Sequence, residues 1–380
     1  MCEAGVTVEN RILKLDPADW SGSSMGTEST LHQLAPYIGK LKSNLVRELI
    51  QSYTKPKDTI FDPFAGAGTV ALESLTLGRN AIANDINPYA VTLTKAKMFP
   101  PNSLDDTIEK AHYYLKRSKK EINTCSLSEI PDWVRSFFHP TTLKEIVVLS
   151  RLLKENEEYF LLACLLGILH HQRIGFLSYP SSHLVPYLRT KKFPKEDFAE
   201  LYTYREVSPR LINKIKRAFR RFPNYDPTLS KKCLQEDATT LRLPDNSIDA
   251  VITSPPYMNA LDYGRDNRLR LWFLDEEDYT YYDKKNPSSV EDFKILIERT
   301  LNNLKYALNQ GSYCIFILGE VHKSNNSINT GLIFKDIALN KMNDFKMVSI
   351  IEDKIPDIRR TRKNGNKTKK EWIIVLQRED

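Results

Sequence analysis

Two patterns of apolar and polar residues divide the chain. Before about residue 100 and after about residue 232, short apolar runs of strand length alternate with helix-length segments that carry an apolar stripe. That alternation is typical of an open, mostly parallel sheet covered by helices. The expected elements are a helix at Leu41–Ser52, strand–helix units at Ile60–Leu77 and Ala81–Lys97, and strands that end at Asp237, Thr253, Leu318 and Leu376.

The middle of the chain, from about Pro100 to Lys232, follows a different pattern and is predicted to be mostly helical. Glu158–His171 is apolar nearly all round, which predicts a buried helix. Ile174–Pro194 has the composition of a loop. Arg210–Phe222 predicts a helix with an apolar stripe on one face and a basic stripe on another, the latter formed by Arg210, Lys214, Arg217 and Arg221.

A turn with unusual chemistry follows the apolar run Ile248–Thr253: Ser254-Pro255-Pro256-Tyr257. The prolines fix φ and have no N–H, so they cannot continue a central strand, but their carbonyls remain acceptors. A stiff, acceptor-rich turn beside an aromatic ring suits the binding of a planar ring by its amino group. Taken alone, the motif is more simply an ordinary turn that ends a strand.

A glycine-rich loop lies far upstream, where a short strand enters Asp62-Pro63-Phe64-Ala65-Gly66-Ala67-Gly68-Thr69 and a helix follows. Strand, glycine turn and helix favour a nucleotide-type ligand, because glycines let it approach the backbone closely. A third glycine at dinucleotide spacing and a Gly-Lys-Ser/Thr are both missing, which argues against an NAD fingerprint and a P-loop. Asp85 ends the next strand about 20 positions later, where an acidic residue is expected to bind ribose hydroxyls.

These motifs, in this order, resemble those of S-adenosylmethionine-dependent amino-methyltransferases that act on DNA. The closest resemblance is to the cytosine-N4/adenine-N6 group of restriction–modification enzymes. It rests on D-P-F-A-G-A-G-T, N-D-I-N-P and T-S-P-P-Y, and on His32–Leu41, which looks like the family segment that closes over the methionine end of the cofactor. It covers roughly Leu31–Met98 and Cys233–Gln377. The implied fold class is α/β: a Rossmann-like class I methyltransferase sheet, mostly parallel with an antiparallel C-terminal strand, plus a largely helical insertion.

The resemblance implies S-adenosyl-L-methionine as cofactor and a set of residues that bind it. The cofactor-binding candidates are Tyr37, Asp62, Phe64, Ala65, Gly66, Gly68, Thr69, Asp85, Ile86 and Asp237. Two of them have plain structural alternatives, since Tyr37 could be a core tyrosine and Asp237 a turn aspartate.

The catalytic candidates are Ser254, Pro255, Pro256 and Tyr257. Ser254 Oγ and the Pro255 carbonyl would accept hydrogen bonds from an exocyclic amine, whose nitrogen is otherwise a poor nucleophile. Tyr257 would stack on a target base that has left the duplex.

Composition and charge are compatible with a polyanionic partner. The chain is 41% apolar and 27% charged with a formal net charge of +7, which is ordinary for a globular protein and compatible with double-stranded DNA. A cognate restriction endonuclease that acts on the same site is a possible further partner. Solvated surface is the alternative explanation for the basic candidates. The residues expected to contact DNA are Ser181, His183, Arg217, Arg221, Arg265, Arg359, Arg360 and Arg362.

Several classes are disfavoured. The longest apolar run, Phe160–Leu169, is about half of what a membrane span needs, and the N-terminus lacks a signal pattern, so we expect a cytoplasmic, prokaryotic protein with no membrane association. The five cysteines form no C-x-x-C pair. His170, His171 and His183 lack acidic or thiol partners at ligand spacing, so we expect no metal.

The sequence therefore predicts a site-specific DNA methyltransferase that modifies cytosine N4. Serine at position 254 resembles the cytosine-N4 members, whereas aspartate there is more typical of adenine-N6 enzymes, which are the alternative. More distant alternatives are an RNA amino-methyltransferase and a catalytically inactive DNA-binding module. The expected division is a cofactor-binding half at 1–99, a helical insertion for target recognition at 100–232, and a catalytic half at 233–380.

Overall fold

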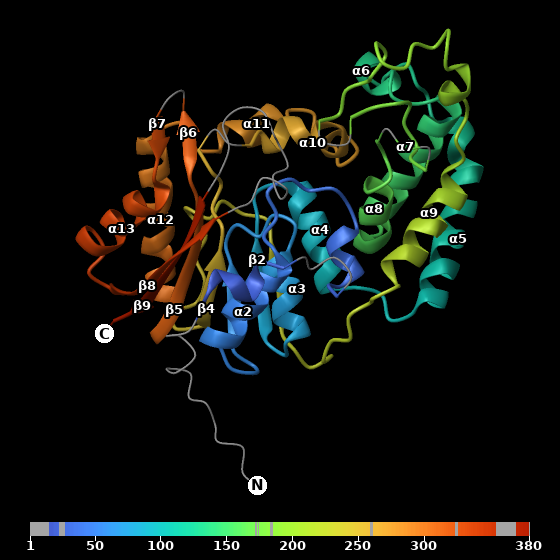
Figure 1. The fold of residues 1–380 in the computed structure, drawn as a ribbon. Coiled ribbons are helices and arrows are strands. Elements are labelled where there is room, and N and C mark those ends of the chain that lie inside the picture. The colour runs from blue at the N-terminus through green and yellow to red at the C-terminus, as the bar shows by residue number, and fades with distance from the viewer. Residues whose placement is uncertain are drawn as a thin grey trace.

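A seven-stranded sheet forms the centre of the computed structural model, which describes residues 15–22, 27–171, 173, 175–182, 185–258, 261–323, 326–354 and 370–379 (Figure 1). The strand order is β3-β2-β1-β4-β5-β9-β8. The strands are β1 (Thr59–Asp62), β2 (Asn80–Asn84), β3 (Lys231–Leu234), β4 (Ile248–Thr253), β5 (Leu308–Gly319), β8 (Phe345–Lys354) and β9 (Lys370–Arg378). A separate hairpin pairs β6 (Val321–Lys323) with β7 (Asn326–Ile328).

The strand directions confirm the predicted fold class. β1 runs parallel to both β2 and β4, and β2–β3 and β4–β5 are also parallel pairs. β9 is antiparallel to both of its neighbours, β5 and β8. β8, with an alternating rather than continuous burial pattern, was not expected from the sequence. Residues 355–369, between β8 and β9, lie outside the described residues.

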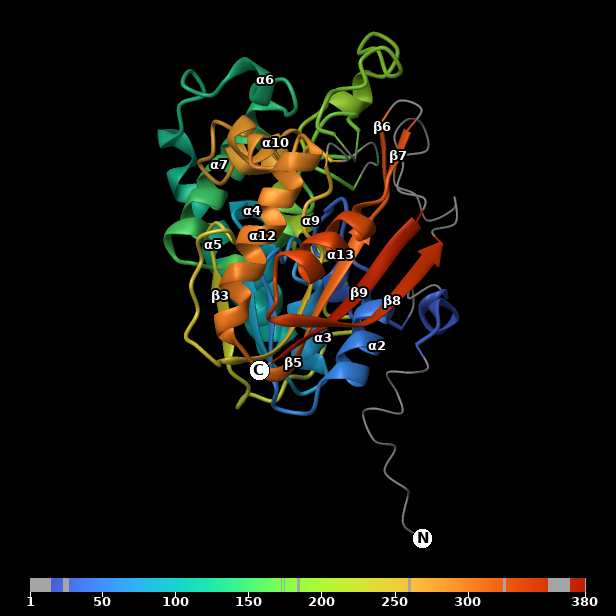
Figure 2. The same ribbon diagram turned by 90° about the vertical axis from the view of Figure 1, so that its left-hand side faces the viewer.

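Helices cover both faces of the sheet, and Figure 2 shows α2 and α12 on opposite sides of it. One face packs Ile252 and Ile317 against Leu49 of α2. The other packs Phe316 against Phe293 of α12 and Phe334 of α13. The core helices are α2 (Ser43–Tyr53), α3 (Thr69–Thr76), α4 (Pro88–Met98), α10 (Tyr263–Trp272), α11 (Thr280–Lys284), α12 (Val290–Ala307) and α13 (Thr330–Asn340), with 3-10 turns η1 (Pro17–Trp20) and η2 (Thr30–Gln33).

The helical insertion lies between β2 and β3 and stands beside the sheet, in green in Figure 1. Its side chains join those of α4 and α10 in one hydrophobic core. It contains α5 (Leu104–Glu121), η3 (Ile122–Thr124), α6 (Asp132–Arg135), α7 (Pro140–Glu155), α8 (Tyr159–Leu166), η4 (Ala199–Tyr202) and α9 (Val207–Ala218).

Two helices of the insertion differ in length from the prediction. α8 ends at Leu166 rather than His171, since Gly167 meets the N-terminal part of the chain so closely that a Cβ there would lie 2.1 Å from the Leu34 carbonyl oxygen. α9 ends at Ala218, and beyond it the rings of Phe219 and Phe222 stack 4.1 Å apart. No helix within the described ranges is long and apolar enough to cross a membrane.

Candidate active site

A cavity of about 390 Å³ opens where the carboxyl ends of β1, β2 and β4 meet. Its size is within the range of small-molecule sites, about 300–1,000 Å³. Residues from both sequence motifs line it, although they are nearly 190 positions apart in the chain. The predicted cofactor residues in its wall are Tyr37, Asp62, Phe64, Ala65, Gly66, Thr69, Asp85, Ile86 and Asp237. Gly68, the tenth, is the N-cap of α3.

The glycine loop needs both of its glycines. Gly66 and Gly68 have φ values of +50° and +70°, which side-chain-bearing residues rarely adopt. A Cβ on Gly68 would lie 2.7 Å from Thr94 Oγ1 and 3.0 Å from Thr94 Cα, so substitution would push α4 away. A Cβ on Gly66 would lie 3.2 Å from Tyr37 Cε1. The glycine loop is therefore packed closely against Thr94 on one side and against Tyr37 on the other.

Asp85 ties the end of β2 to that loop. Its Oδ2 accepts the Gly66 N–H at 2.8 Å, and its Oδ1 accepts the Asn87 N–H at 2.9 Å. Burial raises the pKa of Asp85 to about 6, against the lowering effect of these backbone hydrogen bonds. The backbone N–H of Ile86 also stabilises the carboxylate. A carboxylate has about four acceptor positions, so Asp85 can still accept a hydrogen bond from a ligand hydroxyl at the cavity wall.

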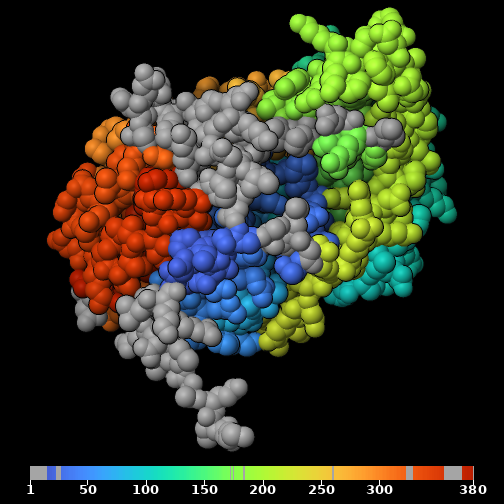
Figure 3. All heavy atoms as spheres, viewed as in Figure 1, coloured from blue at the N-terminus to red at the C-terminus, as the bar shows by residue number. Residues whose placement is uncertain are grey.

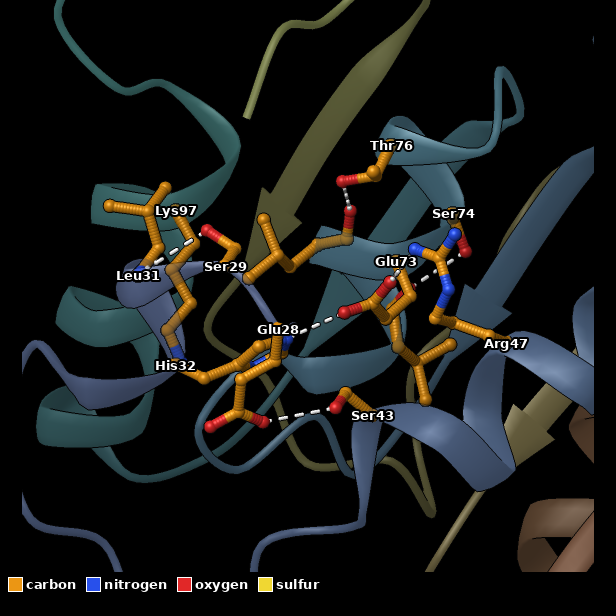
Figure 4. Close-up of polar contacts among 12 residues, drawn as sticks. Glu28, Ser29, Leu31, His32, Ser43, Arg47, Glu73, Ser74, Thr76 and Lys97 are labelled. Atoms are coloured by element: carbon orange, nitrogen blue, oxygen red, sulfur yellow. Dashed lines mark hydrogen bonds and ion pairs between the residues drawn. The ribbon is translucent and has the colours of Figure 1, made fainter. Parts of the chain in front are cut away.

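The residues 27–42, which we call the N-terminal arm, carry Tyr37 and are fixed by a polar network (Figure 4). His32 Nε2 lies 2.6 Å from Glu73 Oε1, and Arg47 contacts the other carboxylate oxygen at 2.7 Å. Ser43 Oγ donates to Glu28 at 3.0 Å. Burial lowers the pKa of His32, so the main charge pair joins Glu73 and Arg47. The network clamps the arm onto α2 and α3.

Tyr37 satisfies both of its predicted descriptions. Its ring lines the cavity next to Gly66, and it packs in a tyrosine cluster with ring centroids 6.0 Å from Tyr89 and 6.1 Å from Tyr263. Tyr89 OH in turn donates to the Pro36 carbonyl at 2.8 Å. The cluster presents Tyr37 to the cavity as a fixed wall.

The two motifs are joined directly across the β1–β4 pairing. Thr253 Oγ1 donates to Asp62 Oδ1 at 2.6 Å, and the same oxygen accepts the Phe64 N–H at 3.1 Å. Asp62 is 2% exposed, and burial raises its pKa to about 7. Its carboxylate therefore braces the glycine loop against the residue that precedes Ser254.

The Ser254–Tyr257 turn sits at the cavity, with Ser254 and Pro256 in its wall and Pro255 buried behind them. Ser254 Oγ donates to Tyr257 OH at 3.2 Å, and Tyr257 OH donates to Glu371 Oε1 at 3.3 Å. Burial raises the pKa of Glu371 to about 7, with Lys42 acting in the opposite direction. A hydrogen-bonded chain thus runs from the cavity to the half-buried carboxylate of Glu371.

Sequence reasoning missed Glu371, because only the antiparallel pairing of β9 with β5 brings it to the turn. It also missed Lys97, whose buried ammonium donates to the Ala67 carbonyl beneath the glycine loop and whose pKa burial lowers to about 7. Lys97 lies in the last turn of α4, most of which is apolar. Only the helical spacing of the sequence could have indicated that this lysine points inward. Lys285, which also lines the cavity, was missed as well.

Asp237 is both a turn residue and a cavity residue. Its Oδ1 accepts the Thr239 N–H at 2.9 Å, and its Oδ2 lies 3.1 Å from Lys285 Nζ. Burial raises the pKa of Asp237, but the hydrogen bonds from Thr239 and Lys285 outweigh it and hold the pKa below its usual value. The segment that carries Lys285 closes the far side of the cavity.

The predicted DNA contacts have mixed positions. Arg217 and Arg221 are exposed, and Arg221 Nε donates to the Glu28 carbonyl at 2.9 Å. The Arg265 side chain is 47% exposed and pairs with Asp262.

Ser181 is fully buried, and its Oγ lies 3.1 Å from Ser178 Oγ, where the loop folds back on itself. Its contact with DNA stays a prediction. His183, Arg359, Arg360 and Arg362 lie outside the described residues. Among the residues that are described, no three His, Cys, Asp or Glu side chains are grouped to hold a metal.

Comparisons with known proteins agree with this geometry. A family model of N6/N4 type, described as DNA methylase, matches residues 23–96. The chain is 28% identical to the Type II methyltransferase M.BsoBI of Geobacillus stearothermophilus over 64% of this chain and 53% of that protein. It is 25% identical to the Type II methyltransferase M.MvaI of Kocuria varians over 66% of this chain and 58% of that protein. The chain thus spans a little over half the length of these relatives.

Among solved structures, TrmN from Thermus thermophilus overlaps 92% of this chain and 52% of its own, with 11% identity and a TM-score of 0.37, a likeness too loose to support any inference. The chain is thus similar to DNA methylases of the N6/N4 type and to Type II methyltransferases, a likeness that makes S-adenosylmethionine the cofactor to fit to the cavity.

The cavity fits that cofactor on its own chemistry. The buried hydroxyl of Thr69 and the side-chain amide nitrogen of Asn87 both line it and have no hydrogen-bond partner among the described residues. Buried polar groups in native proteins are normally satisfied, so a polar ligand is expected beside them. Gly66 and the remaining acceptor positions of Asp85 lie in the wall of the same cavity, so they also favour a polar ligand there.

Proposed function

We propose that this chain is a site-specific methyltransferase that modifies the exocyclic N4 of cytosine in duplex DNA as part of a restriction–modification system. The observation that carries the proposal is that Ser254 and Pro256 line the same cavity as Gly66 and Asp85. An acceptor turn and a nucleotide-type cradle in one cavity suit methyl transfer to a flipped base.

The cofactor side of the cavity positions the donor. When bound, S-adenosylmethionine supplies a methyl group on a sulfonium that is already a good leaving group. Asp85 would accept hydrogen bonds from its ribose hydroxyls, and Ile86 and Asp237 would border its adenine. Gly66, backed by Tyr37, lets its backbone approach closely. These residues bind and orient, and none of them needs to change protonation.

The turn holds the amine. With Glu371 ionised, Tyr257 OH donates to Glu371 and accepts from Ser254 Oγ, which leaves the lone pairs of Ser254 free to accept an N–H of the target amine. Hydrogen bonds in such a chain polarise one another, so each acceptor becomes stronger. Acceptance of the N–H pulls the amine nitrogen towards tetrahedral geometry, and positioning supplies most of the remaining rate.

Binding of duplex DNA is assigned to the helical insertion and to basic side chains near the cavity. Arg217 and Arg221 form an exposed pair at the end of α9, and Arg265 lies at the start of α10. Phosphate contacts of this kind fix the position of a duplex without reading its sequence. Target recognition is proposed to lie within residues 100–232.

The test is methylation of mixed-sequence duplex DNA with labelled S-adenosylmethionine, followed by digestion to nucleosides. We expect label in N4-methylcytosine, and label in N6-methyladenine would move the assignment to the alternative base. Label in RNA alone, or in neither base, would refute the proposal. In a matched reaction, replacement of Pro255 and Tyr257 by alanine should abolish transfer while cofactor binding survives. A companion endonuclease would be sought by cleavage of unmethylated but not methylated DNA.

A further inference from the structure

A second cavity, of about 350 Å³, lies between the N-terminal arm and the helical insertion, and we call it the basic cavity. Lys40 of the arm, Lys214 of α9 and Arg270 of α10 line it, and no acidic residue does. In Figure 3 the blue surface of the arm is set back beside the yellow-green surface of the insertion. Three elements that are distant in sequence therefore bring three cations to one hollow.

Arg270 forms the floor of the basic cavity and is only 1% exposed. Its Nε donates to the Leu166 carbonyl and its Nη1 to Asn267 Oδ1, both at 3.3 Å, and its guanidinium lies 5.4 Å from the centre of the Tyr89 ring. Nη2 has no hydrogen-bond partner, and no carboxylate pairs with the guanidinium, among the described residues. A buried guanidinium without a counter-ion is costly, which makes a ligand anion the expected partner.

The two lysines face the same hollow with donors to spare. Lys214 Nζ donates to the Gln33 carbonyl at 2.7 Å, and Lys40 Nζ donates to the His32 carbonyl at 2.9 Å. An ammonium has three N–H donors, so each lysine keeps two. Burial lowers the pKa of Lys214 to about 8, and the charge of Lys40 contributes to that shift.

Burial lowers the pKa of Lys40, and the charge of Glu28 opposes that shift. Glu28 accepts a hydrogen bond from Ser43 and does not line the cavity. Within the described residues, then, the basic cavity offers several donors and several positive charges and no acceptor carboxylate. Such a set of side chains would repel a cation. It also offers more hydrogen-bond donors than one water molecule can accept from.

We propose that the basic cavity binds a phosphate group and that, resting on the proposed function, this phosphate belongs to the backbone of the DNA substrate. A guanidinium fork flanked by ammonium groups is the arrangement that proteins use for phosphate oxygens. Exposed Arg217 extends the positive surface outward along α9, which suits a polyanion better than a single small anion. Lys40 also lines the first cavity, so the two cavities adjoin at this residue.

The first experiment uses the full chain and inorganic phosphate. Thermal unfolding is followed in phosphate and in chloride at equal ionic strength for the unchanged protein, Lys214→Gln and Lys216→Gln. Lys216 is the matched control, because it is an exposed lysine on the same helix that does not line the cavity. We expect phosphate to raise the melting temperature of the unchanged protein and of Lys216→Gln, and Lys214→Gln to lose that rise. Equal responses of all three proteins would overturn the site.

The second experiment measures affinity for a mixed-sequence duplex as salt is varied. Loss of one phosphate contact should lower the magnitude of the slope of log K against log salt by about 0.9 in Lys214→Gln, and Lys216→Gln should keep more of the slope. Arg270→Gln, whose folding is checked by S-adenosylmethionine binding, should behave like Lys214→Gln.

A phosphate-dependent melting shift with unchanged duplex slopes would overturn the assignment to DNA and leave a site for free phosphate. A fall in S-adenosylmethionine affinity in Lys214→Gln, without any phosphate effect, would overturn the proposal and assign the cavity to the cofactor. Neither readout needs methyl transfer, so failure of the proposed function would be seen separately.

Discussion

Replacement of Glu371 by glutamine tests the hydrogen-bonded chain behind the active-site turn. The substitution keeps the size of the side chain and an acceptor for Tyr257 but removes the charge. The pKa of Glu371 is raised from 4.5 to about 7, mainly by burial. The folded protein therefore prefers the protonated carboxyl, and the unfolded chain releases that proton at lower pH.

The sign of the effect on stability follows from that difference. The stabilising effect of the protonated carboxyl is fully present below pH 4.5 and is lost as the pH rises through about 7, because the folded state must then hold a buried charge. A difference of about 2.5 pKa units corresponds to about 3 kcal/mol. Glutamine does not ionise, so Glu371→Gln should unfold like the unchanged protein near pH 5 and be more stable by up to about 3 kcal/mol near pH 8.5.

Urea unfolding of both proteins across that pH range measures the effect. A gap in the free energy of unfolding that grows with pH supports the assignment. A gap that is constant with pH, or a variant that is less stable throughout, would refute the reasoning about the buried charge.

As the pH rises, the rate of methyl transfer should increase while the free energy of unfolding decreases. When Glu371 is protonated it donates to Tyr257, the chain reverses, and Ser254 turns its own hydroxyl hydrogen towards the amine. The rate of the unchanged protein should therefore rise as the pH passes about 7, whereas Glu371→Gln should lose that rise and retain its affinity for the cofactor. Tyr257→Phe, which breaks the chain at its middle, should lose it too. The same pH profile in all three proteins would exclude a positioning role for Glu371.

Three further substitutions test the glycine loop and its supports. Gly68→Ala should lower stability by about 1–2 kcal/mol and weaken cofactor binding in calorimetry, whereas Gly78→Ala, with a similar φ of +77° but nothing within 4 Å, should cost similar backbone strain and leave cofactor binding intact. Thr253→Val leaves a buried acceptor on Asp62 and should lower the free energy of unfolding by about 1–3 kcal/mol. The stability of the unchanged protein should rise with pH between about 7 and 10.5, where the unfolded chain still protonates Lys97 and the folded state does not, and Lys97→Met should lack that rise in urea titrations.

The parts of the site that sequence could place are those carried by short, contiguous motifs at strand ends. Gly66, Asp85 and Ser254 each follow a buried parallel strand, and the carboxyl ends of neighbouring parallel strands meet at one edge of a sheet. Their convergence in one cavity therefore followed from fold class alone.

The positions of other residues depend on contacts between distant parts of the chain, which no local sequence pattern indicates. Glu371 reaches the turn only because β9 inserts antiparallel between β5 and β8. The burial of Arg270 could not be foreseen, because it requires the arm and the insertion to meet around this side chain. The burial of Ser181 could not be foreseen either, because it depends on an isolated bridge between Ser181 and Leu188 within its loop.

The place of the helical insertion has a consequence for how such a protein can diversify. It leaves the sheet after β2 and returns at β3, and these two strands are neighbours at the outer edge of the sheet. The pairing that unites the cofactor loop with the catalytic turn, β1 with β4, lies one strand further in. Changes within the insertion thus leave the β1–β4 pairing itself untouched, provided that the packing of the insertion against α4, α10 and the N-terminal arm is kept. If target choice resides there, as proposed, evolution or a designer can change the recognised site without reassembling the chemistry.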